Sequence, residues 1–137
     1  MSRTPEQKSW DSFSDSIDQR KLKALRIENL YSGESMPDVL GINRKGTVFW
    51  IENKALEKWP ARASTFPMKD SFEPGQLTFG RMWRFWKGHS FVLLRVGKNQ
   101  YILLNPIREL HLMTQQELIE TSCHLGKLEI LEYLESL

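Results

Sequence analysis

The chain has 137 residues, the length of one domain, and 40% hydrophobic residues, with five Trp and seven Phe, are enough to build a core. The single cysteine, Cys123, excludes an internal disulfide, and we expect a small apolar core residue rather than a nucleophile. Residues 1–10 lack the apolar core of a signal peptide, and no stretch reaches the roughly 18 to 20 apolar residues of a membrane span. We therefore expect a soluble, cytoplasmic protein without membrane association.

The net charge of +2 conceals an uneven distribution along the chain. Residues 1–100 hold 17 Lys and Arg against 11 Asp and Glu, a net +6, whereas residues 101–137 hold 2 against 6, a net −4. A basic body favours a polyanionic partner, although an ordinary solvated surface explains the same excess equally well.

The first quarter of the chain predicts a helix followed by a strand. Thr4, Pro5 and Glu6 form a helix start, and apolar residues then recur at helical spacing, so we expect a helix over 5–23. Residues 24–31 place charged residues between apolar ones and lead into a Ser-Gly turn, which indicates a short strand.

A tight hairpin and a long loop come next. Apolar residues at 39–42 and 47–52 flank an Asn-Arg-Lys-Gly turn, a pattern that is typical of two paired strands. From 55 to 72 the chain is polar and contains two prolines, so we expect a long loop that flanks the functional site.

A second helix is predicted where Pro and Gly precede a run of aromatic residues. It opens at residues 73–76, extends to about Lys87 and is closed by Gly88 as the C-terminal cap. The side chains expected to face the core are Leu77, Met82, Trp83 and Trp86. Core packing is the main interpretation of the aromatic run Trp83, Phe85 and Trp86, and a base-stacking platform is the alternative.

The remaining elements complete the predicted fold. Apolar strands at 91–96 and 100–104 form a second hairpin, and a Thr-x-x-Glu capping box at 114–117 begins a third helix. Residues 127–137 form an amphipathic Leu-rich helix, which is either the last core helix or the interface of a homodimer. The order of elements predicts an α/β fold with a mixed central β-sheet flanked by helices, in a single domain over 1–137.

The first hairpin brings together three side chains with complementary chemistry. Asp38 begins one strand and Glu52 ends its antiparallel partner, so pairing places the two carboxylates at one end of the sheet. Two neighbouring anions are tolerated when a divalent cation lies between them. Lys54 is two residues beyond Glu52 in an extended segment, so its ammonium group leaves the same face.

This combination of groups suits the hydrolysis of a phosphodiester. A metal ion lowers the pKa of a bound water and neutralises charge on the phosphate, while Lys54 positions the nucleophile or helps to deprotonate it. Oxygen ligands, with neither Cys nor His nearby in the sequence, favour Mg²⁺ or Mn²⁺ over zinc.

The motif resembles that of the PD-(D/E)xK nuclease superfamily, because Pro37-Asp38 is followed by a hairpin and by Glu52-Asn53-Lys54. The preceding segment is similar to that of archaeal Holliday-junction resolvases and small phage nucleases, and the following one to those resolvases and to VRR-type nucleases. The residues that carry this wider likeness are Arg26-Ile27-Glu28-Asn29, Ser32-Gly33, Gln76, Gly88 and 91–96, within a stretch of roughly 24–96.

The resemblance implies a restriction-endonuclease-like core with catalytic residues Asp38, Glu52, Lys54 and Gln76. Gln76 would orient the attacking water or contact the scissile phosphate. The superfamily usually adds another acid, for which Glu28 is our choice as a third metal ligand beside Asp38 and Glu52. Asp11, Asp15 and Asp18 are the alternatives. Asn53 departs from the usually apolar middle residue of the motif, so its amide needs hydrogen-bond partners if it is buried.

Cations directed at the phosphate backbone supply most of the non-specific affinity of proteins for DNA. The candidates for this role are Lys45, Lys58, Arg62, Lys69, Arg81, Arg84 and Lys87. The three histidines, His89, His111 and His124, are too scattered for a metal site or a catalytic triad and receive no role.

The sequence therefore predicts a Mg²⁺-dependent DNA endonuclease that cuts branched or junction DNA in phage-type replication or recombination. A sequence-specific homing or restriction-like nuclease is the neighbouring alternative, but no base-reading module is recognisable. Two further alternatives are a catalytically silent DNA-binding module and a protein-interaction module that uses the acidic, Leu-rich C-terminus.

Overall fold

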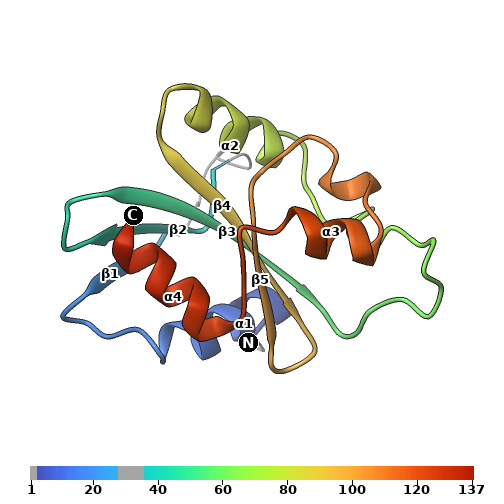
Figure 1. The fold of residues 1–137 in the computed structure, drawn as a ribbon, viewed down its shortest axis with the longest axis horizontal. Helices are drawn as coiled ribbons and strands as arrows, with labels where there is room; N and C mark the ends of the chain where they lie inside the picture. The colour runs from blue at the N-terminus through green and yellow to red at the C-terminus, as the bar shows by residue number, and fades with distance from the viewer. Residues whose placement is uncertain (1–2, 28–35) are drawn as a thin grey trace.

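The computed structural model describes residues 3–27 and 36–137, and within them the chain forms one six-stranded sheet flanked by four α-helices (Figure 1). The strands are β1 (Leu22–Arg26), β2 (Val39–Asn43), β3 (Val48–Leu56), β4 (His89–Val96), β5 (Gln100–Leu104) and β6 (His124–Leu125). The helices are α1 (Pro5–Ser14), α2 (Gln76–Phe85), α3 (Gln115–Thr121) and α4 (Lys127–Ser136), with a short 3₁₀ turn, η1 (Leu110–Leu112).

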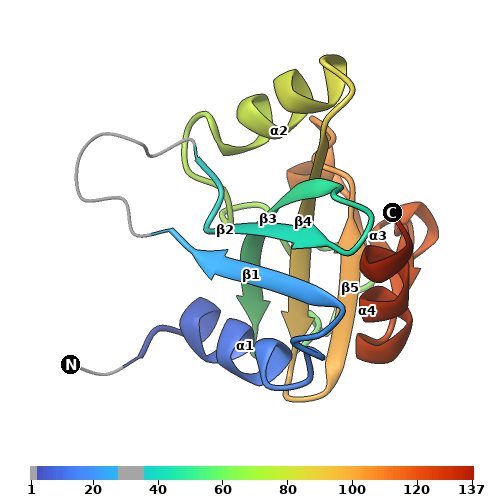
Figure 2. The ribbon, with the colours of Figure 1, turned by 90° about the vertical axis from the view of Figure 1, so that its left-hand side faces the viewer.

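The strands lie in the sheet in the order in which they occur in the chain. β3 and β4 are parallel because α2 crosses over between them, whereas every other neighbouring pair is antiparallel. Figure 2 shows the twist of the sheet, in which β1 and β5 run in clearly different directions. The predicted α/β fold with a mixed central sheet is therefore confirmed. Among the described residues, no helix is both long and apolar enough to cross a membrane.

Each face of the sheet has its own apolar cluster, because successive strand residues point to opposite faces. One cluster joins α1 and α4 to the sheet through residues that include Phe13, Phe49, Ile51, Phe91, Leu93, Tyr101, Ile130 and Leu134. The other cluster covers the opposite face and includes Met68, Val92, Leu94, Ile102, Leu104, Leu110 and Leu118. The second face is the one that α3 and the loop before α2 cover.

The first helix was predicted over 5–23 but ends at Ser14. Asp18 explains part of the difference, since its side chain accepts the backbone N–H of Arg20 (2.9 Å) and favours a turn over a helix. Ile17 packs against the core although it is not helical, which is why the apolar spacing continued beyond the helix. The following strand starts at Leu22, two residues before the predicted start, and its predicted residues 28–31 lie outside the described part of the chain.

β3 is longer than predicted and extends through Lys54 to Leu56. Its last residues pair with β4, up to Leu56 opposite Val96, and this long-range pairing leaves no local signal in the sequence. The loop predicted over 55–72 therefore starts two residues later. β6 and η1 were not predicted, because two or three residues are too few to show a periodic pattern.

The predicted core side of α2 is partly wrong. Trp83 packs against Trp50 and Phe79, but the side chains of Phe85 and Trp86 are 77% and 74% exposed, and Met82 is also exposed. The helix ends at Phe85, so Trp86 no longer follows its helical face. The base-stacking interpretation of Phe85 and Trp86 remains a prediction.

The end of α2 also corrects the role of Gly88. The left-handed backbone conformation belongs to Lys87 (φ 70°), while Gly88 donates its N–H to the carbonyl of Trp83 (3.0 Å). This bond, with the one from the Lys87 N–H to the Arg84 carbonyl, forms a Schellman-type C-terminal cap. Glycine is required at position 88 because a Cβ there would collide with the Trp83 indole.

α4 packs into the core, as one of the two interpretations predicted. Ile130, Leu131 and Leu134 are buried in the cluster that contains α1, and the start of α4 reaches α1 through a hydrogen bond from Lys127 Nζ to the Ser12 carbonyl (3.2 Å). Cys123 is half-buried against the same cluster, and burial raises the pKa of its thiol, in agreement with an apolar role. A homodimer remains a prediction.

Alanine substitutions should separate the exposed aromatic residues from the core. We expect Trp86→Ala to change the free energy of unfolding by no more than about 0.5 kcal/mol, because the ring buries little surface. Phe91→Ala should cost about 3 to 5 kcal/mol, because its ring is 1% exposed. Urea denaturation followed by circular dichroism measures both values. A loss above about 1.5 kcal/mol for Trp86→Ala would show that the ring is packed in solution.

Candidate active site

Glu52 and Lys54 lie side by side on the sheet face that carries the second apolar cluster. In the parallel register, Glu52 is next to Val92 and Lys54 is next to Leu94. Each of the two charged side chains is only 8% exposed. The spacing of two residues thus places a carboxyl group and an ammonium group on one face, as expected. Both groups are buried rather than exposed at the surface.

Aromatic contacts hold α2 above the same face. The Trp50 ring meets the rings of Phe79 and Trp83 edge-on, with centroids 5.7 and 6.0 Å apart. Trp50 is two residues before Glu52, so the aromatic contacts and the charged pair share one row of β3. As a result the first residue of α2, Gln76, comes within hydrogen-bond distance of the charged pair.

Gln76 connects the two charged side chains. Its Oε1 accepts hydrogen bonds from Lys54 Nζ (2.9 Å) and from the backbone N–H of Glu73 (2.9 Å). Its Nε2 donates to Glu52 Oε2 (3.2 Å), and the same carboxylate oxygen lies 3.4 Å from Lys54 Nζ. The amide of Gln76 can satisfy these partners in one orientation only, because its oxygen faces two donors and its nitrogen faces an acceptor.

Asp38 is half-buried and is fixed by the main chain next to this group. Its Oδ2 accepts the backbone N–H of Asn53 on β3 (3.0 Å), and its carbonyl accepts the N–H of Ile27 (2.7 Å). Because Asn53 lies between Glu52 and Lys54, this bond brings the Asp38 carboxylate to the same stretch of β3. We call Asp38, Glu52, Lys54 and Gln76 the carboxylate–lysine cluster.

The electrostatics of the cluster are dominated by Glu52. The pKa of its carboxyl is raised from 4.5 to about 8, chiefly by burial and also by the nearby charge of Asp38, while Lys54 acts in the opposite direction. Among the residues that the structure describes, Glu52 Oε1 is buried and has no hydrogen-bond partner. Without a bound cation, the surroundings of this carboxyl therefore disfavour its charged form.

Two contacts in the cluster were not expected from the sequence. The ring of Phe72 lies under the ammonium group of Lys54, with 5.2 Å from Nζ to the ring centroid. The position of a Phe just before the Glu-Pro-Gly turn was the available signal. Asn53 contributes its backbone N–H, whereas its buried Oδ1 lacks a hydrogen-bond partner among the described residues.

The three candidate third acids on or near α1 do not join the cluster. Asp11 pairs with Arg3 (2.7 Å), and Asp18 pairs with Arg20 (3.1 Å). Asp15 is exposed at the end of α1. Within residues 3–27 and 36–137, no group of three or more His, Cys, Asp or Glu side chains is placed to hold a metal ion. Glu28, the preferred third ligand, lies outside the described residues.

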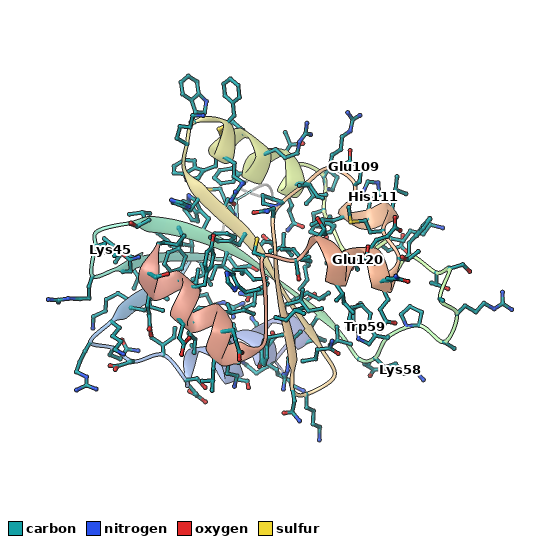
Figure 3. The ribbon with its side chains drawn as sticks, viewed as in Figure 1. Lys45, Lys58, Trp59, Glu109, His111 and Glu120 are labelled. Atoms are coloured by element: carbon teal, nitrogen blue, oxygen red, sulfur yellow. The ribbon has the colours of Figure 1, made fainter. Side chains whose placement is uncertain are left out.

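The predicted DNA-binding cations are spread over the molecule. Lys45 is in the β2–β3 turn, where its Nζ donates to the Ser136 carbonyl (2.9 Å). The start of β3 after this turn, Val48, is roughly 20 Å from Lys54 at 3.3 Å per residue. Figure 3 shows Lys45 and Lys58 at opposite ends of the protein. Arg84 packs over the Phe91 ring. The remaining cations are exposed on the loop before α2 and on or just after α2: Lys58, Arg62, Lys69, Arg81 and Lys87.

No protein-family model matches this chain, and no curated protein gives a significant match. Among solved structures, the chain is similar to Hjc, a Holliday junction resolvase from the archaeal hyperthermophile Archaeoglobus fulgidus. The TM-score is 0.57 and the sequence identity is 13%, over 95% of this chain and 97% of the resolvase chain. At this level of identity the likeness establishes a shared fold over almost the whole length of both chains.

Glu52→Gln should reduce the pH dependence of stability when EDTA keeps divalent cations away. Because folding raises the pKa of Glu52, its contribution to stability is fully present below about pH 4.5 and is lost as the pH rises through about 8. Between pH 5 and 9, the free energy of unfolding should fall by on the order of 2 to 4 kcal/mol more in the wild type than in Glu52→Gln. Urea denaturation at each pH measures this difference, and parallel curves would contradict it.

Proposed function

We propose that this chain is a metal-dependent DNA endonuclease of the PD-(D/E)xK kind, with one nuclease domain and with branched DNA as its substrate. The observation that carries the proposal is the buried Glu52–Lys54 pair, 3.4 Å apart, with Gln76 bonded to both side chains and Asp38 fixed beside them. This combination of acids and a cation suits the hydrolysis of a polyanionic substrate.

The two carboxylates fit a divalent cation. Glu52 has a buried oxygen without a partner among the described residues, and its raised pKa comes partly from the charge of Asp38, a conflict that a cation between them relieves. Asp38 and Glu52 would hold Mg²⁺ or Mn²⁺, which would neutralise charge on the scissile phosphate. Glu28 stays a candidate ligand on the basis of the sequence alone.

Lys54 is the residue that we assign to the phosphate and to the attacking water. Its ammonium group is held between Gln76 Oε1 and the Phe72 ring, so little side-chain freedom is left to lose when substrate binds. A fixed positive charge in a poorly solvated position stabilises the negative charge that develops during phosphodiester hydrolysis. Gln76 acts as a positioning residue through Lys54 and Glu52.

The choice of substrate rests on the shared fold. Hjc is described as a Holliday junction resolvase, and branched DNA is therefore the first substrate to test for this chain. Junction cutting would suit a role in phage-type DNA replication or recombination. Enzymes that cut two strands often work as symmetric pairs, so we also propose a homodimer.

The decisive experiment is the cleavage of a labelled panel of linear, single-stranded, nicked, flap and four-way-junction DNA with Mg²⁺, Mn²⁺ or EDTA. We expect metal-dependent cutting that is fastest on branched DNA. Lys54→Ala should reduce the rate by about 100-fold or more, because it removes an electrostatic stabiliser of the transition state. The affinity for DNA should change by less than about threefold, since single phosphate contacts contribute modestly.

Lys8→Ala is the matched control, because it removes an exposed lysine of α1, on the opposite face of the sheet. Its cleavage rate should stay close to that of the wild type. If the wild type and the control variant both bind branched DNA but cut it with neither metal, the nuclease is rejected in favour of a catalytically silent DNA-binding module.

Gln76→Ala should lower the cleavage rate by about 10- to 100-fold and leave the apparent affinity for DNA almost unchanged, as is typical of residues that orient catalytic groups. The expected cause is the loss of the bonds that fix Lys54 and Glu52. Single-turnover rates over a range of protein concentrations separate the two parameters. Gln76→Glu is a useful companion, because its carboxylate keeps an acceptor for Lys54 but places a third negative charge beside Glu52. If both variants cleave at the wild-type rate, Gln76 has no positioning role.

A further inference from the structure

A cavity of about 550 Å³ opens beside the first turns of α2. It is built by two segments that are far apart in the sequence: residues 69–81, which run from the loop into α2, and residues 108–111 around η1. Side chains that line it include Lys69, Phe72, Glu73, Arg81, Arg108 and His111. Figure 3 shows His111 on the η1 segment, next to Glu109. The volume is that of a site for a small ligand.

The lining of the cavity is electropositive. Among the residues that line it are three cations, Lys69, Arg81 and Arg108, and one carboxylate, Glu73, which gives the lining an excess of two positive charges with His111 not counted. Within the described part of the chain, none of these three cations forms an ion pair. Like charges that outnumber their counter-charges repel each other, and an anion in the cavity reduces that repulsion. α2 adds to the effect, because its N-cap Gly75 provides no side-chain hydrogen bond to the first turn.

The cavity and the carboxylate–lysine cluster share a wall. Phe72 lines the cavity, and its ring is also the one that lies 5.2 Å from Lys54 Nζ. Gln76, which bonds to Lys54 and Glu52, stands in the chain between Gly75 and Leu77, and both of these neighbours line the cavity. One layer of side chains therefore separates the cavity from the carboxylate–lysine cluster.

We propose that this cavity binds a phosphate group of the DNA strand that is being cut, next to the scissile phosphate. The inference rests on the proposed function and extends it to a second subsite, with Arg108 and Arg81 as the main contacts. Guanidinium groups suit this role, because they donate two parallel hydrogen bonds to phosphate oxygens. The bound group is either an internal phosphodiester or the terminal phosphate at a nick, since both present the same oxygens.

Arg108→Ala tests the subsite, because Arg108 is exposed and lies outside the carboxylate–lysine cluster. In a Glu52→Gln background that does not cut, we expect the variant to raise the Kd for branched DNA by about five- to tenfold. The slope of log affinity against log salt should fall by about one unit, as for the loss of one phosphate contact. Arg108→Lys should keep the slope and recover part of the affinity.

Arg44→Ala is the matched control, since it removes an exposed arginine from the β2–β3 turn at the other end of β3. If Arg108→Ala weakens binding no more than Arg44→Ala does, the subsite is rejected. Circular dichroism and the unfolding midpoint exclude a folding defect as the cause of a loss.

Nicked duplexes with a 5′-phosphate or a 5′-hydroxyl at the nick distinguish the two sources of phosphate. A preference for the 5′-phosphate that disappears in Arg108→Ala assigns the cavity to a terminal phosphate. Equal affinity for both duplexes, with the same loss in Arg108→Ala, assigns it to an internal phosphodiester. The binding assay is independent of cutting, so an Arg108 effect without cleavage by the wild type rejects the nuclease alone. Cleavage without an Arg108 effect rejects the subsite alone.

Discussion

The burial of a carboxyl group and an ammonium group on one row of β3 is the constraint on which the site depends. Removing a charged group from water costs several kcal/mol, so Glu52 and Lys54 are stable there only with close partners. Each finds the other at 3.4 Å, and both bond to Gln76. Gln76 reaches them because α2 is the crossover between the parallel strands β3 and β4, held down by Trp50. The docking of α2 on β3 thus supplies the hydrogen-bond partner that the two buried charged groups need.

This arrangement is not the most stable one that the fold could have. Apolar side chains at positions 52 and 54 would continue the wall formed by Val92 and Leu94 without any desolvation cost. The raised pKa of Glu52 and its unpartnered Oε1 show that the charges remain only partly compensated among the described residues. Local conflicts of this kind are expected where a site is built for a ligand, and in the proposed function a divalent cation beside Asp38 would resolve both at once.

The sequence predicted the parts of the fold and site that depend on local rules. Antiparallel pairing across a tight turn placed Asp38 near Glu52, and the two-residue period of a strand placed Lys54 on the face of Glu52. The parts that it did not predict depend on contacts between distant segments. Phe72 reaches Lys54 only because the long loop folds back over β3, and Trp86 is exposed because the cap at the end of α2 turns the chain. Hydrophobic character alone cannot distinguish the buried Trp50 from the exposed Trp86.

The first turn of α2 belongs to both the carboxylate–lysine cluster and the basic cavity. Gln76 bonds to the cluster, while its neighbours Gly75 and Leu77 line the cavity, so the two sites keep a fixed separation as long as α2 stays docked on Trp50. In the proposed function, a strand would have to place one phosphate at Lys54 and another in the cavity at that separation. A rigid spacing between two phosphates selects the path of a backbone and is independent of base sequence. In the proposed function, the two sites would therefore let the protein select DNA by the path of its backbone without a base-reading module.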